Sequence, residues 1–221
     1  MKRSLSATLR YLRSDLSVTA AGAALLSLLS LALGGLMFLL ESPEDAAMMV
    51  TAIMAGGGAL LTLVLTIVYF SNWYTVLLAF PLTRRGLLAG VLLFCLGTSA
   101  LMQLAALVLG TLCTLVLGAA LGCTLAMPWQ VTPWFVWPLA LLAPVLVGLV
   151  MGGVQCRFGP RAFWVMYFVF ILICSTTGQW MPWLTTRFPP AALTGLIAAL
   201  CAAVPAMALL SVRWLLRASV R

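Results

Sequence analysis

Few side chains in this sequence could carry acid–base, nucleophilic or metal chemistry. The chain has no His and a single Lys, Lys2, and its four acidic residues lie near the ends of apolar segments. Its six Cys form no C-x-x-C pair, so neither a zinc site nor a redox pair is indicated. A P-loop needs a Lys after its second Gly, and a serine hydrolase needs a base beside its hydroxyl. We therefore expect no catalytic residue, no metal ligand and no cofactor bound by this chain.

Three of the acids share one turn, Glu41-Ser-Pro-Glu-Asp45. A metal or catalytic site is one interpretation of this cluster. Helix capping is the other, because Ser42 suits an N-cap and Pro43 the first helical position. Carboxylates in the first turn of a helix also complement its positive end. Capping already accounts for the cluster.

The stretch with the densest mixture of aromatic and basic residues is Ser71 to Gly90. It predicts a short helix, a break at Phe80-Pro81 and a basic turn, before another apolar segment begins. We interpret residues 71–86 as a docking surface for a partner on the basic side of a membrane. The candidate contacts are Asn72, Trp73, Tyr74, Phe80, Pro81, Leu82, Thr83, Arg84 and Arg85. The alternatives are interfacial anchoring for the aromatic residues and orientation of the chain for the arginines.

Composition places these residues in a membrane protein. The chain has 221 residues, of which 64% are hydrophobic and 7% charged, against about 25% charged in soluble domains. It predicts an all-α integral membrane protein, with six transmembrane helices over residues 17–213. The six predicted spans are Val18–Leu40, Ala47–Phe70, Leu87–Leu117, Trp134–Val154, Ala162–Thr177 and Ala191–Leu210.

The basic residues predict how these spans are oriented. We number the segments outside the predicted spans in chain order, starting with the N-terminal segment. Of the 12 basic residues, only Arg187 lies in an even-numbered segment, and the others lie in odd-numbered ones. Excess Lys and Arg mark cytoplasmic loops, so both termini are expected in the cytoplasm, with residues 214–221 as a basic tail. This placement also removes any need for a nucleic acid to balance the net charge of +8. Thr177 to Pro190, with two Trp and three Pro, is expected on the outer side, where it could dip back into the interface.

Residues 1–16 precede the first span and have an amphipathic pattern. Leu5, Leu9, Leu12 and Leu16 form one narrow helical stripe, with the basic residues off it. This predicts a helix lying on an anionic membrane surface, although a plain extension of the first span fits the pattern equally well.

Polar groups within the spans are sparse. Gln103 is the one amide at mid-depth, and Thr62 and Thr66 are nearby candidates. Such groups either bond a neighbouring helix or contact a substrate in transit. Gly118-x-x-x-Gly122 and Gly148-x-x-x-Gly152 match a helix-packing pattern, but 18 Gly make chance matches expected.

The six-span plan and the amphipathic N-terminus resemble the membrane subunits of ABC-2 type transporters, in their small Firmicutes-like form. The specific part is Asn72-Trp73-Tyr74 followed by Leu78-Ala79-Phe80-Pro81-Leu82-Thr83-Arg84-Arg85, which is similar to the coupling segment of that family. Arg157, Phe158, Gly159 and Arg161 resemble a second cytoplasmic contact before the fifth span. The sequence departs from the family after Gly86, where an acidic or Lys-bearing stretch is usual.

The resemblance implies an ABC exporter in a cell (plasma) membrane of a bacterium. It would contain two permease chains, identical or different, and separate cytoplasmic ATPase subunits that bind ATP and Mg²⁺. The substrate would be a peptide, drug or lipid-like molecule, and the chain itself would not be an enzyme. Membrane lipid is a further expected contact. The alternatives are a self-contained channel or carrier for an apolar solute, and a non-transporting scaffold or immunity protein.

Overall fold

The computed structural model describes residues 7–8, 10, 12, 16–40, 42–80, 83–159, 161–162, 164–166, 168–169, 171–172, 176 and 190–217. No strand occurs among these residues, so the all-α prediction is confirmed for the part of the chain described. The elements, in chain order, are α2 (Leu16–Leu40), α3 (Pro43–Thr51), a π-helical turn η2 (Ala52–Gly56), α4 (Gly57–Val68), a second π-helical turn η3 (Tyr69–Trp73), α5 (Tyr74–Leu77), α6 (Arg84–Leu121), α7 (Pro128–Val131), α8 (Val136–Phe158) and α10 (Pro190–Arg217).

Within the described residues, four helical stretches are long and apolar enough to cross a membrane: Leu16–Leu40, Pro43–Leu77, Arg84–Leu121 and Val136–Phe158. They correspond to the first four predicted spans. Of the fifth predicted span, the structure describes residues 162, 164–166, 168–169, 171–172 and 176, all of them helical. The connection over 177–189 and the residues 218–221 lie outside the described part of the chain. The sixth predicted range lies within α10, a helix of 28 residues.

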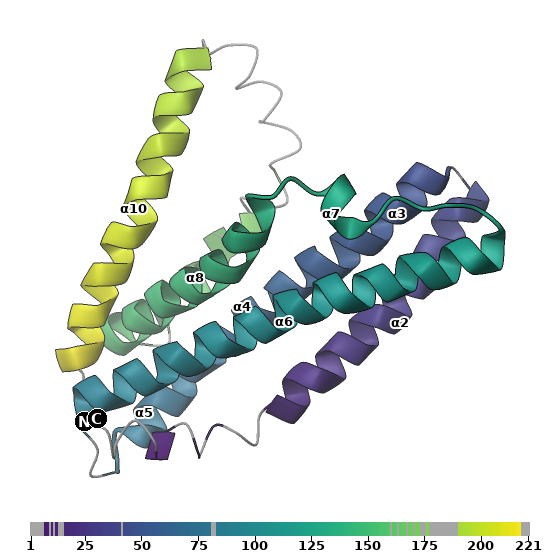
Figure 1. Ribbon diagram of the computed structural model, residues 1–221. Helices are drawn as coiled ribbons and strands as arrows, with labels where there is room; N and C mark the ends of the chain where they lie inside the picture. Colours follow the sequence, from purple (N-terminus) through teal and green to yellow (C-terminus); the bar gives the residue numbers. More distant parts are fainter. Residues whose placement is uncertain are drawn as a thin grey trace.

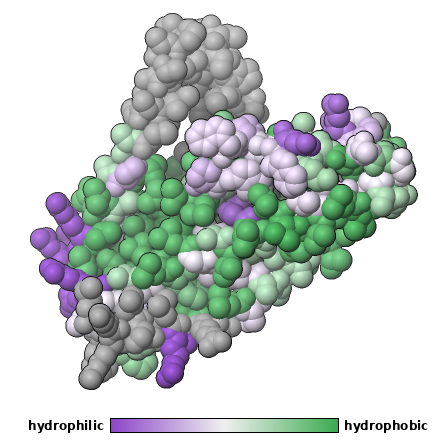
Figure 2. Space-filling model, viewed as in Figure 1, coloured by the Kyte–Doolittle hydropathy of each residue, from purple (hydrophilic) through white to green (hydrophobic). Residues whose placement is uncertain are grey.

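The helices pack as a bundle (Figure 1). Helices α2, α4 and α6 contact one another, and α8 lies against both α4 and α6. The last helix, α10, packs on α8. Apolar side chains cover much of the visible surface of this bundle, as Figure 2 shows. A bundle with an apolar exterior suits a lipid surrounding.

Two apolar cores lie toward opposite ends of the bundle. One contains Phe70, Tyr74, Leu87 and Leu215, all at most 2% exposed. The other joins α3 to the C-terminal half of α6 through residues such as Val50 and Leu117. Between these cores α6 carries the buried polar residues Thr98, Ser99 and Gln103.

The acidic turn is a helix cap, as its sequence predicts. The Ser42 hydroxyl accepts a hydrogen bond of 3.2 Å from the backbone N–H of Asp45, and Pro43 begins α3. The Ser42 hydroxyl also donates to the Asp45 carboxylate. Capping therefore employs the Asp45 side chain. The described residues contain no group of three or more potential metal ligands.

Glycines bring α8 close to two other helices. A Cβ at Gly148 would lie 3.1 Å from the Thr66 carbonyl carbon, and one at Gly152 would lie 3.0 Å from that of Phe70. On the neighbouring face, a Cβ at Gly153 would come within 2.9 Å of Ser211 Cα. The Gly148–Gly152 pattern is therefore a contact surface for α4. Gly122 has φ 68° and ends α6 in the left-handed region, so the other glycine pattern includes a helix stop.

Two boundaries differ from the sequence prediction. The helix that begins at Pro43 continues past Phe70 to Leu77, so the predicted short helix after the second span is its extension. Arg84 and Arg85 form the first turn of α6, where a connecting turn was expected. The physical reason is that Phe70, Tyr74 and Leu77 follow the i, i+4, i+7 spacing of one helical face, and all three are buried.

Candidate coupling surface

The candidate docking segment begins with a widened helical turn. Residues Tyr69–Trp73 form a π-helical turn in which Tyr69, Phe70 and Ser71 are buried. Such turns insert an extra residue and rotate the following helix relative to the preceding one. The helix then ends in a turn, with the Phe80 N–H donating to the carbonyl of Leu77 at 3.2 Å. Pro81 and Leu82 lie outside the described residues.

Tyr74 and Arg84 hold this segment against α10. The Tyr74 hydroxyl donates a 2.9 Å hydrogen bond to the carbonyl of Leu215. Arg84 Nη1 donates to the carbonyl of Leu216 at 3.3 Å. The last carbonyls of a helix have no partner within it, so these side chains complete the C-terminus of α10. The Arg84 cation also complements the negative end of that helix.

The burial of Tyr74 corrects one part of the sequence prediction. Its side chain is 0% exposed and belongs to the apolar core, so it is unavailable to fill a groove on a partner. Trp73 is half-buried and packs against the same core. Arg84 remains exposed but already contacts α10. These three residues thus contact other parts of the same bundle.

The outward surface of the segment consists of other residues. Asn72, Thr83 and Arg85 are exposed, and Phe80 is 51% exposed. Val76, which the sequence prediction omitted, is 49% exposed. We call Asn72, Val76, Phe80, Thr83 and Arg85 the coupling surface. It combines two exposed apolar side chains with an amide and a cation.

The second predicted contact lies at the end of α8. Arg157 and Phe158 occupy the last turn of that helix, and Gly159, with φ 85°, ends it. Phe158 is exposed and its ring meets Trp214 of α10 edge to face, with centroids 5.6 Å apart. Arg161 is also exposed. The end of α8 thus packs on α10, the helix whose carbonyls also accept hydrogen bonds from Tyr74 and Arg84.

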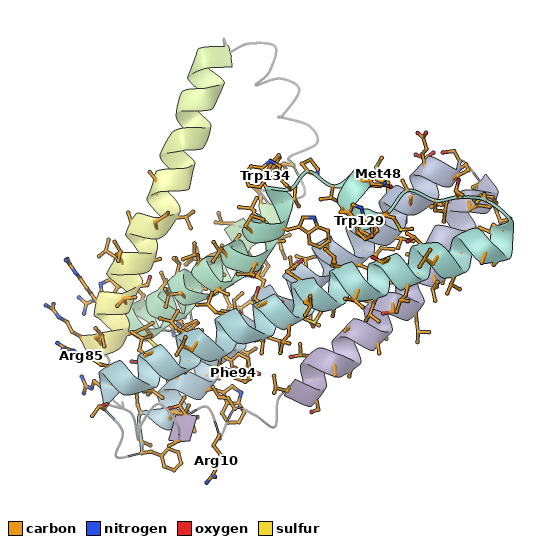
Figure 3. All side chains as sticks on the ribbon, in the orientation of Figure 1. Arg10, Met48, Arg85, Phe94, Trp129 and Trp134 are labelled. Atoms are coloured by element: carbon orange, nitrogen blue, oxygen red, sulfur yellow. The ribbon has the colours of Figure 1, made fainter. Side chains whose placement is uncertain are left out.

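Basic residues therefore gather at one end of the bundle. Arg85 projects from this end in Figure 3, whereas Trp129, Trp134 and Met48 lie toward the other. We call this the basic end; its exposed arginines are Arg10, Arg84, Arg85, Arg157, Arg161, Arg213 and Arg217. Hydrophilic side chains also project from the left of the surface in Figure 2, where α6 and α10 meet.

The N-terminal segment is described at four positions only. Leu12 is fully buried in the core at the basic end, and Thr8 lies against α6, where a Cβ at Gly90 would be 2.9 Å from it. Arg10 is exposed. These positions are helical, and the rest of the predicted amphipathic helix lies outside the described residues.

The predicted substrate-path residues lie within helix contacts. Gln103 is 6% exposed, and its Nε2 donates to the Ala140 carbonyl of α8 at 3.5 Å. Thr62 and Thr66 are 1% exposed and donate to carbonyls of their own helix, Gly58 and Thr62. The interhelical bond expected of Gln103 is present. Gln103 Oε1 is buried without a hydrogen-bond partner, so its acceptor capacity is unused.

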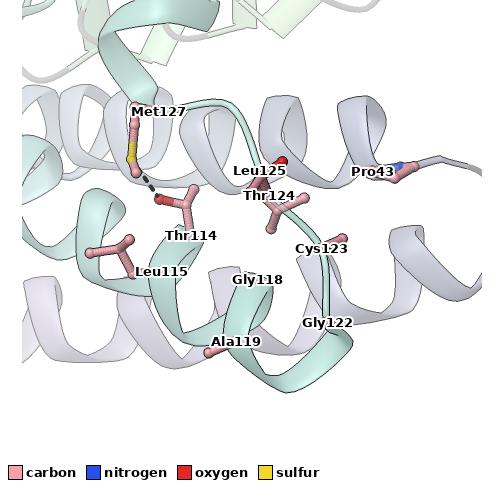
Figure 4. A pocket seen from close by; sticks show the side chains of 10 residues that line it. All are labelled: Pro43, Thr114, Leu115, Gly118, Ala119, Gly122, Cys123, Thr124, Leu125 and Met127. Atoms are coloured by element: carbon pink, nitrogen blue, oxygen red, sulfur yellow. Dashed lines mark hydrogen bonds between the residues drawn. The ribbon is translucent and has the colours of Figure 1, made fainter.

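A groove at the end opposite the arginines offers a different surface. It encloses about 750 Å³ between the C-terminal part of α6, the following loop and Pro43 (Figure 4). Its hydroxyl groups are those of Thr114 and Thr124, and Thr114 donates to Met127 Sδ at 3.7 Å. The described residues that line it are all uncharged.

Comparison with known proteins adds no family to this description. No family model, no curated protein and no solved structure matches the chain. The class rests on the fold: the described part of the chain is helical and has four helices long and apolar enough to cross a membrane, which is compatible with a multi-pass membrane protein.

Proposed function

We propose that this chain is the membrane-spanning permease subunit of an ATP-driven exporter of the ABC-2 type. A separate cytoplasmic ATPase would bind ATP and Mg²⁺, and a second permease chain would complete the transporter. The substrate would be a peptide, drug or lipid-like molecule. The observation that carries the proposal is the coupling surface. It is exposed, and the segment that bears it is connected to α4, α6 and α10.

The connections of this turn suit the transmission of force. The helix leading into it is continuous with α4, and Arg84 begins α6. Tyr74 and Arg84 bond the C-terminal carbonyls of α10. A displacement applied at Phe80 would therefore reach three helices, because packed interiors transmit strain. A loop that only connects two spans would not require these contacts with a third helix.

The distribution of charge supports the side on which the ATPase would bind. The exposed arginines lie at the end of the bundle that bears the coupling surface. Positively charged connections are retained in the cytoplasm, where ATP is available. The plasma membrane is the corresponding location, with Trp129 and Trp134 toward the outer interface.

The coupling surface can be tested by removing its apolar contacts. We expect Val76→Ala combined with Phe80→Ala to abolish co-purification with the ATPase, because both side chains are about half exposed and would be buried in the complex. The measurement is affinity purification of the tagged chain, co-expressed with each candidate ATPase of the same genome. Phe135→Ala with Leu139→Ala is the matched control, since those side chains are 53% and 61% exposed away from the basic end.

Equal recovery of the ATPase with both double variants would contradict the coupling surface. Transport in liposomes by this chain alone would instead support the self-contained carrier. Substrate resistance that persists after the ATPase is inactivated would support an immunity or scaffold role. Unaltered thermal stability of the Val76/Phe80 variant would show that the loss is one of association.

A further inference from the structure

A second cavity lies between α4, α8 and α10 and is lined only by apolar residues. It encloses about 490 Å³, within the range of small-ligand pockets. Helix α4 contributes residues from Leu60 to Ile67, α8 contributes Val147 and Val150, and α10 contributes Ala203 and Met207. Val165 and Val169, which follow α8, also line it. Among the residues that the structure describes in this lining, no side chain can donate or accept a strong hydrogen bond, so the lining suits a hydrocarbon occupant.

The cavity is short enough to lie within one leaflet of a bilayer. Leu60 to Ile67 spans roughly 10 Å along a helix at 1.5 Å per residue, whereas half of a hydrocarbon core is about 15 Å. Val150 and Arg157 are seven residues apart on α8, so they lie roughly 10 Å apart along one side of that helix. Arg161 precedes Val165 by one helical turn. Two lining segments thus lead from the cavity toward arginines at the basic end.

The basic rim of the cavity has the features of a headgroup site. Arg157 and Arg161 are exposed, and no ion pair is found for either in the described part of the chain. Next to Arg157, at the end of α8, Phe158 packs on Trp214, and tryptophan prefers the interface of a membrane. Arginine binds phosphate oxygens through a planar fork of donors. The arginines therefore lie where the headgroup of a lipid would be if its acyl chain occupied the cavity.

We propose that this cavity holds one acyl chain of an anionic phospholipid, whose phosphate is bound by Arg157 and Arg161. The lipid belongs to the leaflet at the basic end. It fills the space between α4, α8 and α10 and is a structural part of the bundle. This binding requires the chain to lie in a membrane but does not depend on an ATPase partner.

Native mass spectrometry of the detergent-purified full chain tests the proposal. The probes are phosphatidylglycerol and phosphatidylcholine with identical acyl chains, added at equal concentration. We expect phosphatidylglycerol to be retained at roughly tenfold higher occupancy, on the scale expected when two arginines lie near an anionic lipid. Arg157→Gln with Arg161→Gln should remove this preference. Arg10→Gln with Arg85→Gln, the matched control beside α6, should preserve it.

A second pair of variants tests the acyl chain separately. Ala203→Trp fills the cavity from an exposed position of α10 and should lower the retention of both lipids. Val204→Phe serves the same purpose if the Trp variant does not fold. Unchanged lipid retention in these variants would overturn the proposal, as would equal losses in the two arginine pairs. Loss of a dimer mass without loss of lipid would identify the cavity as a contact between copies of the chain.

Discussion

Gly152→Ala is expected to destabilise the protein severely, because α8 could no longer approach Phe70 in η3. The added Cβ would overlap Phe70 Cβ and lie 3.0 Å and 3.2 Å from the backbone carbonyl carbon and Cα of that residue. A rotation of the Phe70 side chain cannot move those backbone atoms. Overpacking of this kind costs roughly 1–3 kcal/mol, and more where the backbone itself must shift. We expect the apparent Tm to fall by roughly 5–10 °C.

Gly97→Ala is the matched control for this loss. A Cβ at Gly97 in α6 would meet nothing within 4 Å, so the substitution adds a methyl group to open space. Alanine also favours a helix over glycine by about 1 kcal/mol. The apparent Tm, followed by intrinsic tryptophan fluorescence in detergent, should stay level or rise for Gly97→Ala. Equal melting of the two variants would mean that α8 and η3 are further apart than described.

The helices themselves follow from the sequence, and their ends do not. Long apolar runs predict the first four helices because their backbone groups must bond internally in lipid. Hydrophobicity alone cannot show where a helix leaves the membrane, since a buried residue and a lipid-facing residue look alike. Hydrophobicity therefore predicts that the second span stops at Phe70. In the structure the helix continues to Leu77, with Tyr74 and Leu77 buried.

Which residues share a contact is harder to predict than which residues are helical. The spacing of Gly148 and Gly152 is one of several such patterns in a glycine-rich chain, and only the structure shows that these face Thr66 and Phe70. The contacts of the candidate docking segment, residues 71–86, are equally hard to predict. Its composition predicts an aromatic and basic turn, but Tyr74 faces the interior while Val76, two residues on, faces outward. The i, i+4, i+7 spacing of Phe70, Tyr74 and Leu77 contains that information, because it assigns Tyr74 to the buried face.

Gln103 illustrates what sequence leaves open at membrane depth. Its position predicts either a bond between helices or a contact with substrate, and the first is present through Ala140. One acceptor of its amide remains without a partner. The structure thus assigns one hydrogen bond of this amide to helix packing, and the role in a substrate path stays a prediction.

Tyr74→Ala is expected to lower the stability of the chain as strongly as any substitution in the coupling segment. The side chain is fully buried among Phe70, Leu87 and Leu215, and removing a buried aromatic ring costs about 3–5 kcal/mol. The change also leaves the Leu215 carbonyl without its hydrogen bond from the Tyr74 hydroxyl. Trp134→Ala removes an aromatic ring that is 82% exposed and should change the apparent Tm little.

Tyr74→Phe separates the hydroxyl from the ring. It keeps the packing and loses only the 2.9 Å hydrogen bond to α10, so we expect a loss of about 1 kcal/mol. The apparent Tm should then be highest for the wild type, lower for Tyr74→Phe and lowest for Tyr74→Ala. If Tyr74→Ala instead melts like the wild type but loses the ATPase, the ring belongs to the partner contact and the assignment of Tyr74 to the core is wrong. A normal Tm in Val76→Ala/Phe80→Ala, beside a low Tm in Tyr74→Ala, would distinguish the outward face of this turn from the inward one.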